Sequence, residues 1–171
     1  MFSSRLFSEL GLRLGLGIMG SETHGMSQRG GSVIAHLKLG DFQSPMIRRG
    51  TADILYSFEE NETYRTLKFL RGGSVCFVNL ANADRFNRKV LDYLKQRDIT
   101  FKAFDASGAA SKIGSIRSAN TALIGFSVGT GLVPFKYKDV RYVLERMSQK
   151  KQLAANLKAF EIGIQEGKLK R

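Results

Sequence analysis

Short apolar segments alternate with helical patterns through the first two thirds of the chain, and this alternation restricts the possible folds more than any other feature. The predicted strands are Val33–Leu39, Asp53–Phe58, Ser74–Val78 and Ile99–Phe104. A predicted helix, Glu59–Leu70, separates two of them, and Asp84 can cap a further helix before the last strand. Helical crossovers of this kind join parallel strands. We therefore expect an α/β fold, a three-layer sandwich with a mostly parallel sheet.

Beyond Asp105 the pattern becomes purely helical. Helices are predicted at Ala119–Val128, Lys138–Met147 and Gln152–Gln165, and at residues 3–14, where Leu6, Leu10 and Leu14 share one face. Gly125 and Gly129 would allow a close approach by another helix. Because no internal repeat or convincing linker interrupts the chain, residues 1–171 are predicted to form a single domain with a helical C-terminal third.

The first predicted strand has two different faces. Val33, Ala35, Leu37 and Leu39 fall on one side, and His36 and Lys38 on the other. This alternation is typical of a half-exposed strand. We expect the apolar side to be buried and His36 to face solvent.

Composition excludes several kinds of site. Cys76 is the only cysteine, whereas an iron–sulfur cluster needs about four thiolates. With only two histidines, His24 and His36, a zinc site is not expected either. The sequence therefore predicts a chain with no metal and no redox centre of its own. No apolar run approaches the roughly 20 residues of a membrane span, and no clean cleavage site follows the N-terminal residues, so we expect a cytoplasmic protein.

The formal net charge of +12 points to an anionic partner, which could be nucleic acid, an anionic cofactor or an acidic protein surface. The cations are spread along the chain, with concentrations at Arg85–Lys89, Lys136–Arg146 and the tail Lys168–Arg171. No zinc-finger spacing, RNP-type strand or clear helix-turn-helix accompanies them. Basic helix faces are most often simply solvated, and nucleic-acid binding remains the second interpretation.

One loop collects polar and flexible residues just before the first predicted strand. It reads Glu22-Thr23-His24-Gly25-Met26-Ser27-Gln28-Arg29-Gly30-Gly31-Ser32. Gly30 and Gly31 let the backbone approach a ligand with its N–H groups, and Arg29 offers a planar donor fork for phosphate or carboxylate. Ser27 and Gln28 add neutral donors. A surface turn with a solvated arginine is the alternative.

Three further polar residues have possible roles. His24 with Ser27 could form a base and nucleophile, but no acid completes the set, and a histidine that fixes the loop is the simpler interpretation. Asn79 ends a buried strand, where ligands of open α/β sheets bind, so Asn79 and the following Leu80–Ala83 are site candidates. Asn120, at a helix start, could donate to a ligand or cap the helix. No catalytic residue is predicted.

Several of these passages occur in an order that is typical of one protein family. The loop is followed by Phe42-Gln43-Ser44-Pro45-Met46-Ile47, Gly50-Thr51-Ala52-Asp53-Ile54-Leu55, Gly72-Gly73-Ser74-Val75-Cys76-Phe77-Val78-Asn79, the helix from Asn120 to Gly131, and Asn156-Leu157-Lys158-Ala159-Phe160-Glu161-Ile162-Gly163. This ordered set, over residues 5 to 163, resembles the gamma component of the 2-oxoacid:ferredoxin oxidoreductases, most closely the small subunit of the indolepyruvate type. Members of that family open with a strand and a G-x-G-G-Q-G turn, whereas Met1–Phe7 resembles the middle of the first helix. We expect both features to be missing, either because the start was placed too late or because this version has lost them.

The resemblance implies a function that the residues alone would not give. Such enzymes decarboxylate a 2-oxoacid oxidatively with thiamine diphosphate, pass electrons through iron–sulfur clusters to ferredoxin, and release an acyl-CoA. The gamma component completes the assembly and contributes to the coenzyme A side of the site, while a large, alpha-type partner subunit holds the cofactors. The resemblance thus implies a non-autonomous subunit of an oxidoreductase, with ferredoxin reached through the complex. The alternative is a stand-alone basic α/β protein that binds nucleotides or nucleic acid.

Overall fold

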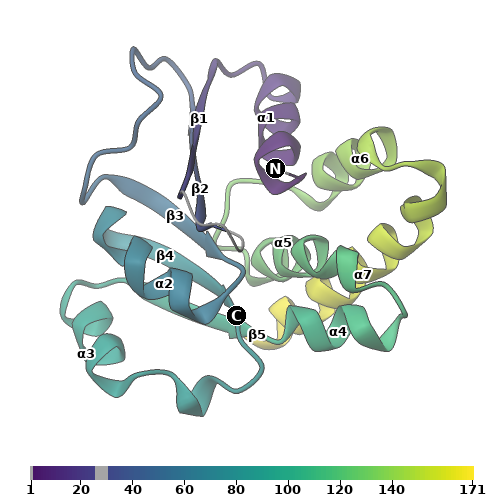
Figure 1. The fold of residues 1–171 in the computed structure, drawn as a ribbon. Helices are drawn as coiled ribbons and strands as arrows, with labels where there is room; N and C mark the ends of the chain where they lie inside the picture. The colour runs from purple at the N-terminus through teal and green to yellow at the C-terminus, as the bar shows by residue number, and fades with distance from the viewer. Residues whose placement is uncertain (1, 26–30) are drawn as a thin grey trace. The chain divides into compact units, whose positions relative to one another are not determined.

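The computed structural model describes residues 2–25 and 31–171, and its contacts group the chain into two compact units, Met1–Arg48 and Arg49–Arg171 (Figure 1). Each unit has its own sheet: two strands in the first unit and three in the second. The expectation of a single domain over residues 1–171 stays a prediction, since two compact groups of contacts can belong to one folding unit or to two.

The first unit is a helix with a β-hairpin. Helix α1 (Phe2–Arg13) precedes strands β1 (Ile18–His24) and β2 (Val33–Leu39), which pair antiparallel along their whole length, from Ile18 opposite Leu39 to His24 opposite Val33. The prediction that Val33–Leu39 belongs to the parallel sheet is therefore wrong. An eight-residue connection can close a hairpin but cannot make the crossover that a parallel pair needs. Strand β1 was not predicted, because Gly20, Ser21 and Glu22 break its apolar alternation.

The burial of β2 is the reverse of the expected pattern. His36 is only 5% exposed, whereas Val33 is 49% exposed. Residues that follow the hairpin cover the polar side. Ile47 donates its backbone N–H to Nδ1 of His36 over 3.3 Å, and Sδ of Met46 accepts a hydrogen bond from Ser21, which lies opposite His36. The alternation located the two faces correctly but could not show which of them the next segment would cover.

The second unit contains the predicted parallel sheet. Its strands β3 (Ala52–Ser57), β4 (Leu70–Asn79) and β5 (Thr100–Phe104) lie in the order β3-β4-β5, all parallel. The mixed α/β class, the parallel sheet and the helical C-terminal third are thus confirmed. The central strand is longer than predicted: β4 starts at Leu70, because the predicted helix divides into α2 (Glu60–Thr66) and a 3₁₀ turn (Leu67–Phe69).

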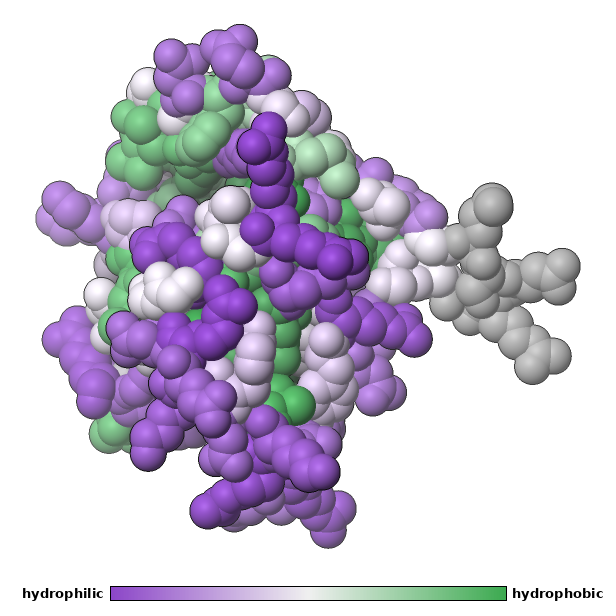
Figure 2. All heavy atoms as spheres, turned by 90° about the vertical axis from the view of Figure 1, so that its left-hand side faces the viewer, coloured by the Kyte–Doolittle hydropathy of each residue, from purple (hydrophilic) through white to green (hydrophobic). Residues whose placement is uncertain are grey.

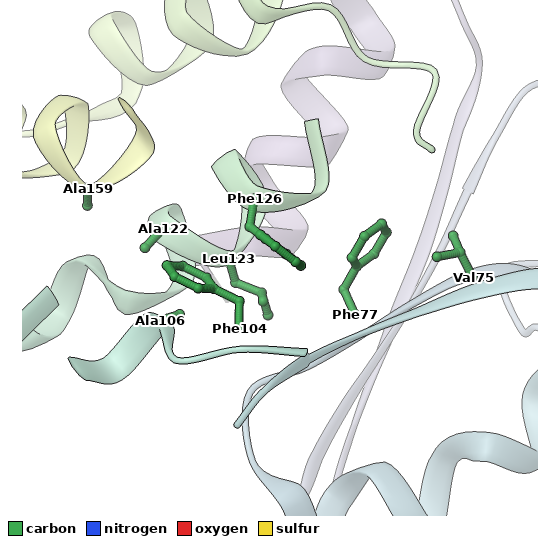
Figure 3. Packing of buried hydrophobic residues seen from close by; sticks show 8 residues of the cluster. All are labelled: Val75, Phe77, Phe104, Ala106, Ala122, Leu123, Phe126 and Ala159. Carbon is green, nitrogen blue, oxygen red and sulfur yellow. The ribbon is translucent and has the colours of Figure 1, made fainter. Parts of the chain in front are cut away.

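Helices cover both faces of this sheet (Figure 1). On one face α2 contacts β3 and β4, and α3 (Arg88–Gln96) contacts β5. On the other face lie α4 (Ala106–Lys112), α5 (Ala119–Thr130) and α7 (Lys150–Leu169). Phe77 and Phe104 point from the sheet toward Phe126 of α5, and their rings meet it at centroid distances of 6.2 and 5.1 Å (Figure 3). Helix α6 (Tyr137–Met147) packs against α7.

The start of α3 differs from the sequence-based expectation. Asn87, not Asp84, caps α3, because its side-chain oxygen accepts from the backbone N–H of Lys89 over 3.0 Å. The N–H of Asp84 is instead bound by Asn82, which caps a 3₁₀ turn at Ala83–Arg85. A third 3₁₀ turn, Ile116–Ser118, leads into α5. Asn and Asp both suit a cap position, so the sequence pattern could not choose between neighbouring candidates.

Helices α5 and α7 cross in direct backbone contact through glycines on both sides. A Cβ atom on Gly125 would lie 2.2 Å from the carbonyl oxygen of Phe160, and one on Gly129 would lie 2.4 Å from that of Ile164. Reciprocally, a Cβ on Gly163 would lie 2.0 Å from the carbonyl oxygen of Ala122. The predicted close approach at Gly125 and Gly129 is confirmed, and its partner is the last helix of the chain.

Candidate functional site

The carboxyl ends of the three parallel strands meet at one edge of the second unit, and a hollow of about 340 Å³ opens there. Its floor is mainly apolar, and its rim carries two cations and two carboxylates. The lining residues include Leu80, Ala81 and Ala83 after β4, Phe104 and Asp105 at the end of β5, Lys112 of α4, and Glu166 and Lys170 at the end of the chain. Ligands of open α/β sheets bind at such an edge. Of the predicted candidates Leu80–Ala83, three residues line the hollow, namely Leu80, Ala81 and Ala83.

Two of the four charged groups at the rim are already engaged. Asp105 caps α4, with Oδ1 accepting from the N–H of Gly108 over 2.7 Å. Lys170 donates to the carbonyl oxygen of Ala103 over 2.9 Å, and its ammonium lies 5.7 Å from the ring centroid of Phe126. Lys112 and Glu166 form no ion pair or side-chain hydrogen bond within the described part of the chain. These two groups are the ones a bound molecule could contact.

Asn79 lies at the end of β4, where its side chain joins three elements. Nδ2 donates to the carbonyl oxygen of Phe58, over 3.0 Å, and to Oγ of Ser107, over 2.8 Å. Oδ1 accepts from the N–H of Ser107 over 3.1 Å. Both amide hydrogens are thus used within the protein, which ties the end of β3 to the start of α4. Ligand binding by Asn79 stays a prediction.

The glycine-rich loop lies in the first unit, and only its two ends fall within the described residues. His24 is the exposed last residue of β1, and its side chain makes no hydrogen bond to another described residue. At the neck of the loop the N–H of Gly25 donates to the carbonyl oxygen of Ser32 over 2.8 Å. A Cβ on Gly31 would lie 1.8 Å from the carbonyl oxygen of Gly25, so the neck requires glycine at Gly31. Ser27, Gln28, Arg29 and Gly30 lie outside the described residues.

Asn120 is the second residue of α5, and Ser118 occupies the N-cap position. The capping role considered for Asn120 is therefore wrong. Its neighbour Thr121 is buried, and the hydroxyl of Thr121 has no hydrogen-bond partner. A ligand-donating role for Asn120 stays a prediction. The structure thus brings Leu80, Ala81 and Ala83 to a hollow, whereas the site roles of Asn79, Asn120 and the loop stay predictions.

Burial determines the pKa of the one thiol of the chain. Cys76 is fully buried in β4, and burial raises the pKa of its thiol to about 12. In the described residues no group of three or more His, Cys, Asp or Glu side chains is arranged to hold a metal ion. None of the described helices is long and apolar enough to cross a membrane.

Comparison with known proteins identifies the family. The model of the pyruvate ferredoxin/flavodoxin oxidoreductase family matches residues 1–166. The chain belongs to this family. It is 30% identical to the indolepyruvate oxidoreductase subunit IorB of Archaeoglobus fulgidus, over 96% of this chain and 87% of that protein. It is 32% identical to IorB of Thermococcus kodakarensis, over 97% of this chain and 89% of that protein.

Solved structures share the fold of this oxidoreductase subunit. The gamma subunit of keto/oxoacid ferredoxin oxidoreductase from Geobacter sulfurreducens aligns with a TM-score of 0.74 and 18% identity, over 98% of this chain and 90% of that chain. The 2-oxoglutarate:ferredoxin oxidoreductase from Magnetococcus marinus aligns with a TM-score of 0.75 and 16% identity, over 99% of this chain but 29% of that chain. The gamma-type fold thus occurs both as a separate subunit and as part of a longer chain.

Several motif residues of this 2-oxoacid:ferredoxin oxidoreductase subunit have structural roles. Asn156 is buried in α7, where Oδ1 accepts from the hydroxyl of Ser118 over 2.8 Å and Nδ2 donates to Oγ of Ser148 over 2.9 Å. Gln152 joins this network by donating to Oγ of Ser115 over 2.6 Å. The network fixes α7 against the start of α5. The sequence signal was an asparagine within the apolar stripe of a helix, which indicates a buried amide that needs partners.

Proposed function

We propose that this chain is the small, partner-dependent subunit of an enzyme that oxidatively decarboxylates an aryl or branched 2-oxoacid, such as indolepyruvate, to an acyl-CoA. The observation that carries the proposal is the similarity to IorB subunits, which extends over 96–97% of this chain and 87–89% of those proteins. Agreement over this length includes both compact units and is more specific than a single shared motif.

The chemistry requires a division of labour between subunits. Thiamine diphosphate supplies the carbanion chemistry and iron–sulfur clusters supply the electron path when they are bound. A cluster does not fit the residues of this chain, since its single thiol is buried and holds its proton strongly. A large alpha-type subunit would therefore hold these cofactors and pass electrons to ferredoxin. The chain described here would complete the assembly.

We assign coenzyme A as the ligand of the part of the enzyme's active site that lies near this subunit. Support comes from the Magnetococcus marinus structure of the same fold, which has coenzyme A bound. Further support comes from the loop that includes His24 and Arg29, because a guanidinium beside glycine N–H groups suits a phosphate or pyrophosphate. The neck between Gly25 and Ser32 fixes both ends of this loop.

Substitution of Arg29 tests the proposal in the reconstituted two-subunit enzyme. Charge-assisted hydrogen bonds contribute about 1.5–3 kcal/mol each, so Arg29→Ala should weaken the apparent affinity for coenzyme A, or subunit association, by roughly 10- to 150-fold. Arg29→Lys should recover only part of it, because an ammonium lacks the planar fork. Arg117→Ala, at an exposed arginine of the second unit, is the matched control and should behave like the wild type. Unchanged coenzyme A affinity and normal association in Arg29→Ala would refute the role of the loop.

A further inference from the structure

The outward face of α6 carries a stripe of two cations around an aromatic ring. Lys138, Tyr142 and Arg146 follow one another at spacing four, which places them on the same side of the helix. Val140, Val143 and Leu144 are the buried residues of the opposite face. Tyr142 remains 40% exposed. The Arg146 guanidinium lies 5.6 Å from the centroid of the Tyr142 ring, and Nη1 donates to the Tyr142 hydroxyl over 3.0 Å.

Two of the neighbouring acids pair with Arg141, which lies outside the stripe. The Glu145 carboxylate pairs with Arg141 over 3.0 Å, and the Glu161 carboxylate pairs with the same guanidinium over 3.2 Å. Lys138 and Arg146 form no ion pair with any described carboxylate. Two exposed lysines, Lys150 and Lys151, follow at the start of α7. From residue 136 to residue 151 there are six cations and only two carboxylates.

Helix α3 repeats the same stripe on the other side of the sheet, with Lys89, Tyr93 and Arg97 at the same spacing. The Arg97 guanidinium lies 5.7 Å from the ring centroid of Tyr93 and donates to its hydroxyl over 3.1 Å. Hydrophilic side chains dominate the lower half of the face in Figure 2, the part of the molecule where α2 and α3 lie in Figure 1. Residues 84–98 carry five cations and three carboxylates, so the α3 stripe lies in a less basic segment than the α6 stripe.

The segment that enters α6 carries further exposed apolar side chains. Leu132 is 43% exposed and Tyr137 is 36% exposed, both on the segment that enters α6. Tyr137 is also held in place, because its ring stacks on Phe160 and its hydroxyl donates to Glu161. Tyrosine and arginine on a fixed scaffold are among the residue types that contribute most to protein–protein interfaces.

We propose that the α6 stripe, defined as Lys138, Tyr142 and Arg146, docks an acidic surface of the large oxidoreductase subunit. This inference rests on the proposed function, which supplies the partner. A carboxylate is the complementary group, since Arg146 uses one nitrogen for Tyr142 and presents its remaining N–H groups outward. A protein surface is the assigned occupant, because the stripe sets an exposed tyrosine ring between two cations and the proposed function supplies a protein partner.

A pair of charge-reversal variants with identical chemistry tests this assignment. K138E/R146E reverses the α6 stripe, and K89E/R97E reverses the α3 stripe with the same change in net charge. Affinity of each full-length variant for the large subunit is measured at low ionic strength and at about 1 M salt, where the Debye length falls to about 3 Å. We expect K138E/R146E to bind at least about tenfold more weakly at low salt, K89E/R97E to bind like the wild type, and the difference to shrink at high salt.

The possible outcomes separate this inference from the proposed function. If the wild-type chain does not bind the large subunit, the proposed function fails. If the wild type binds and K138E/R146E binds equally well, or if both reversals weaken binding equally, the docking site fails and the proposed function stands. K138A/R146A, which introduces no new charges, should show a smaller loss in the same direction. Binding of a short RNA that depends on the α6 stripe, together with unchanged affinity for the large subunit, would also overturn the docking site.

Discussion

Replacement of Gly163 by alanine should destabilise the second unit, because it forces α5 and α7 apart. The new Cβ would lie 2.0 Å from the carbonyl oxygen of Ala122 and 2.6 Å from the backbone nitrogen of Phe126, whereas ordinary contact begins at 3.4 Å. Both obstacles are backbone atoms of a helix, so no side-chain rotation relieves the clash. The two helices must separate locally by more than 1 Å, and this movement also disturbs the ring packing of Phe126 against the sheet.

The expected magnitude follows from two opposing effects. Overpacking of a dense interior costs about 1–3 kcal/mol and sometimes more, and a clash between two backbones belongs at or above the upper end of that range. Alanine is the better helix former, which returns about 1 kcal/mol. We therefore expect a net loss of about 2–4 kcal/mol in the free energy of unfolding, which is a large part of the stability of a typical domain.

Urea denaturation followed by circular dichroism measures this loss. Ala154→Gly is the matched control, because Ala154 is an exposed residue of the same helix, and its substitution reports the change in helix propensity alone, about 1 kcal/mol. Gly125→Ala should resemble Gly163→Ala, since its Cβ would meet the carbonyl oxygen of Phe160 from the other side. A Gly163→Ala protein as stable as the wild type would refute the reasoning.

Two further predictions concern buried titratable groups. Burial, together with the charge of Lys38, lowers the pKa of His36 below its ordinary value of 6.5. As the pH falls, the unfolded chain therefore takes up a proton before the folded protein does, and the free energy of unfolding should decrease below about pH 6.5. His36→Gln should remove this dependence of the free energy of unfolding on pH. An unchanged pH dependence in His36→Gln would contradict the prediction. Cys76, buried and with a raised pKa, should react with thiol reagents only as fast as the protein opens; rapid labelling under native conditions would show that the thiol is accessible.

The parts of the fold that sequence predicted best are those governed by burial on both faces. Ser74–Val78 is an apolar run covered by helices on either side, and such a run leaves little choice of structure. The helical C-terminal third was equally clear, because the apolar stripes of α6 and α7 repeat at helical spacing. The glycines of α5 indicated a close helix contact, although not that α7 would supply it.

The hairpin was harder to predict, because its pairing depends on a turn and on later residues. Nothing in Ile18–His24 alternates strongly enough to indicate a strand, yet it pairs with all seven residues of β2. Whether His36 or Val33 would be buried depended on residues 46 and 47, which cover one side of the hairpin. Local sequence patterns do not show which later segment of the chain will cover a strand.

The role of the candidate site residues stays a prediction, although part of their placement followed from a general rule. Ligands of α/β sheets bind at the carboxyl edge, and Leu80, Ala81 and Ala83 line a hollow there. The sequence could not show that the Asn79 amide is used to join β3 and α4, because Phe58 and Ser107 are distant along the chain. Polar residues at a strand end serve ligands and structure alike, and only their partners separate the two roles.

Reconstitution of activity from separate subunits tests the central claim most directly. The isolated chain is assayed for reduction of a viologen dye with indolepyruvate and coenzyme A, and the assay is repeated after addition of the large subunit that carries thiamine diphosphate and iron–sulfur clusters. The account predicts no dye reduction by the chain alone and activity dependent on both the 2-oxoacid and coenzyme A once the two subunits are combined. Dye reduction by the isolated chain, or a large subunit whose activity and coenzyme A dependence do not change when this chain is added, would contradict it.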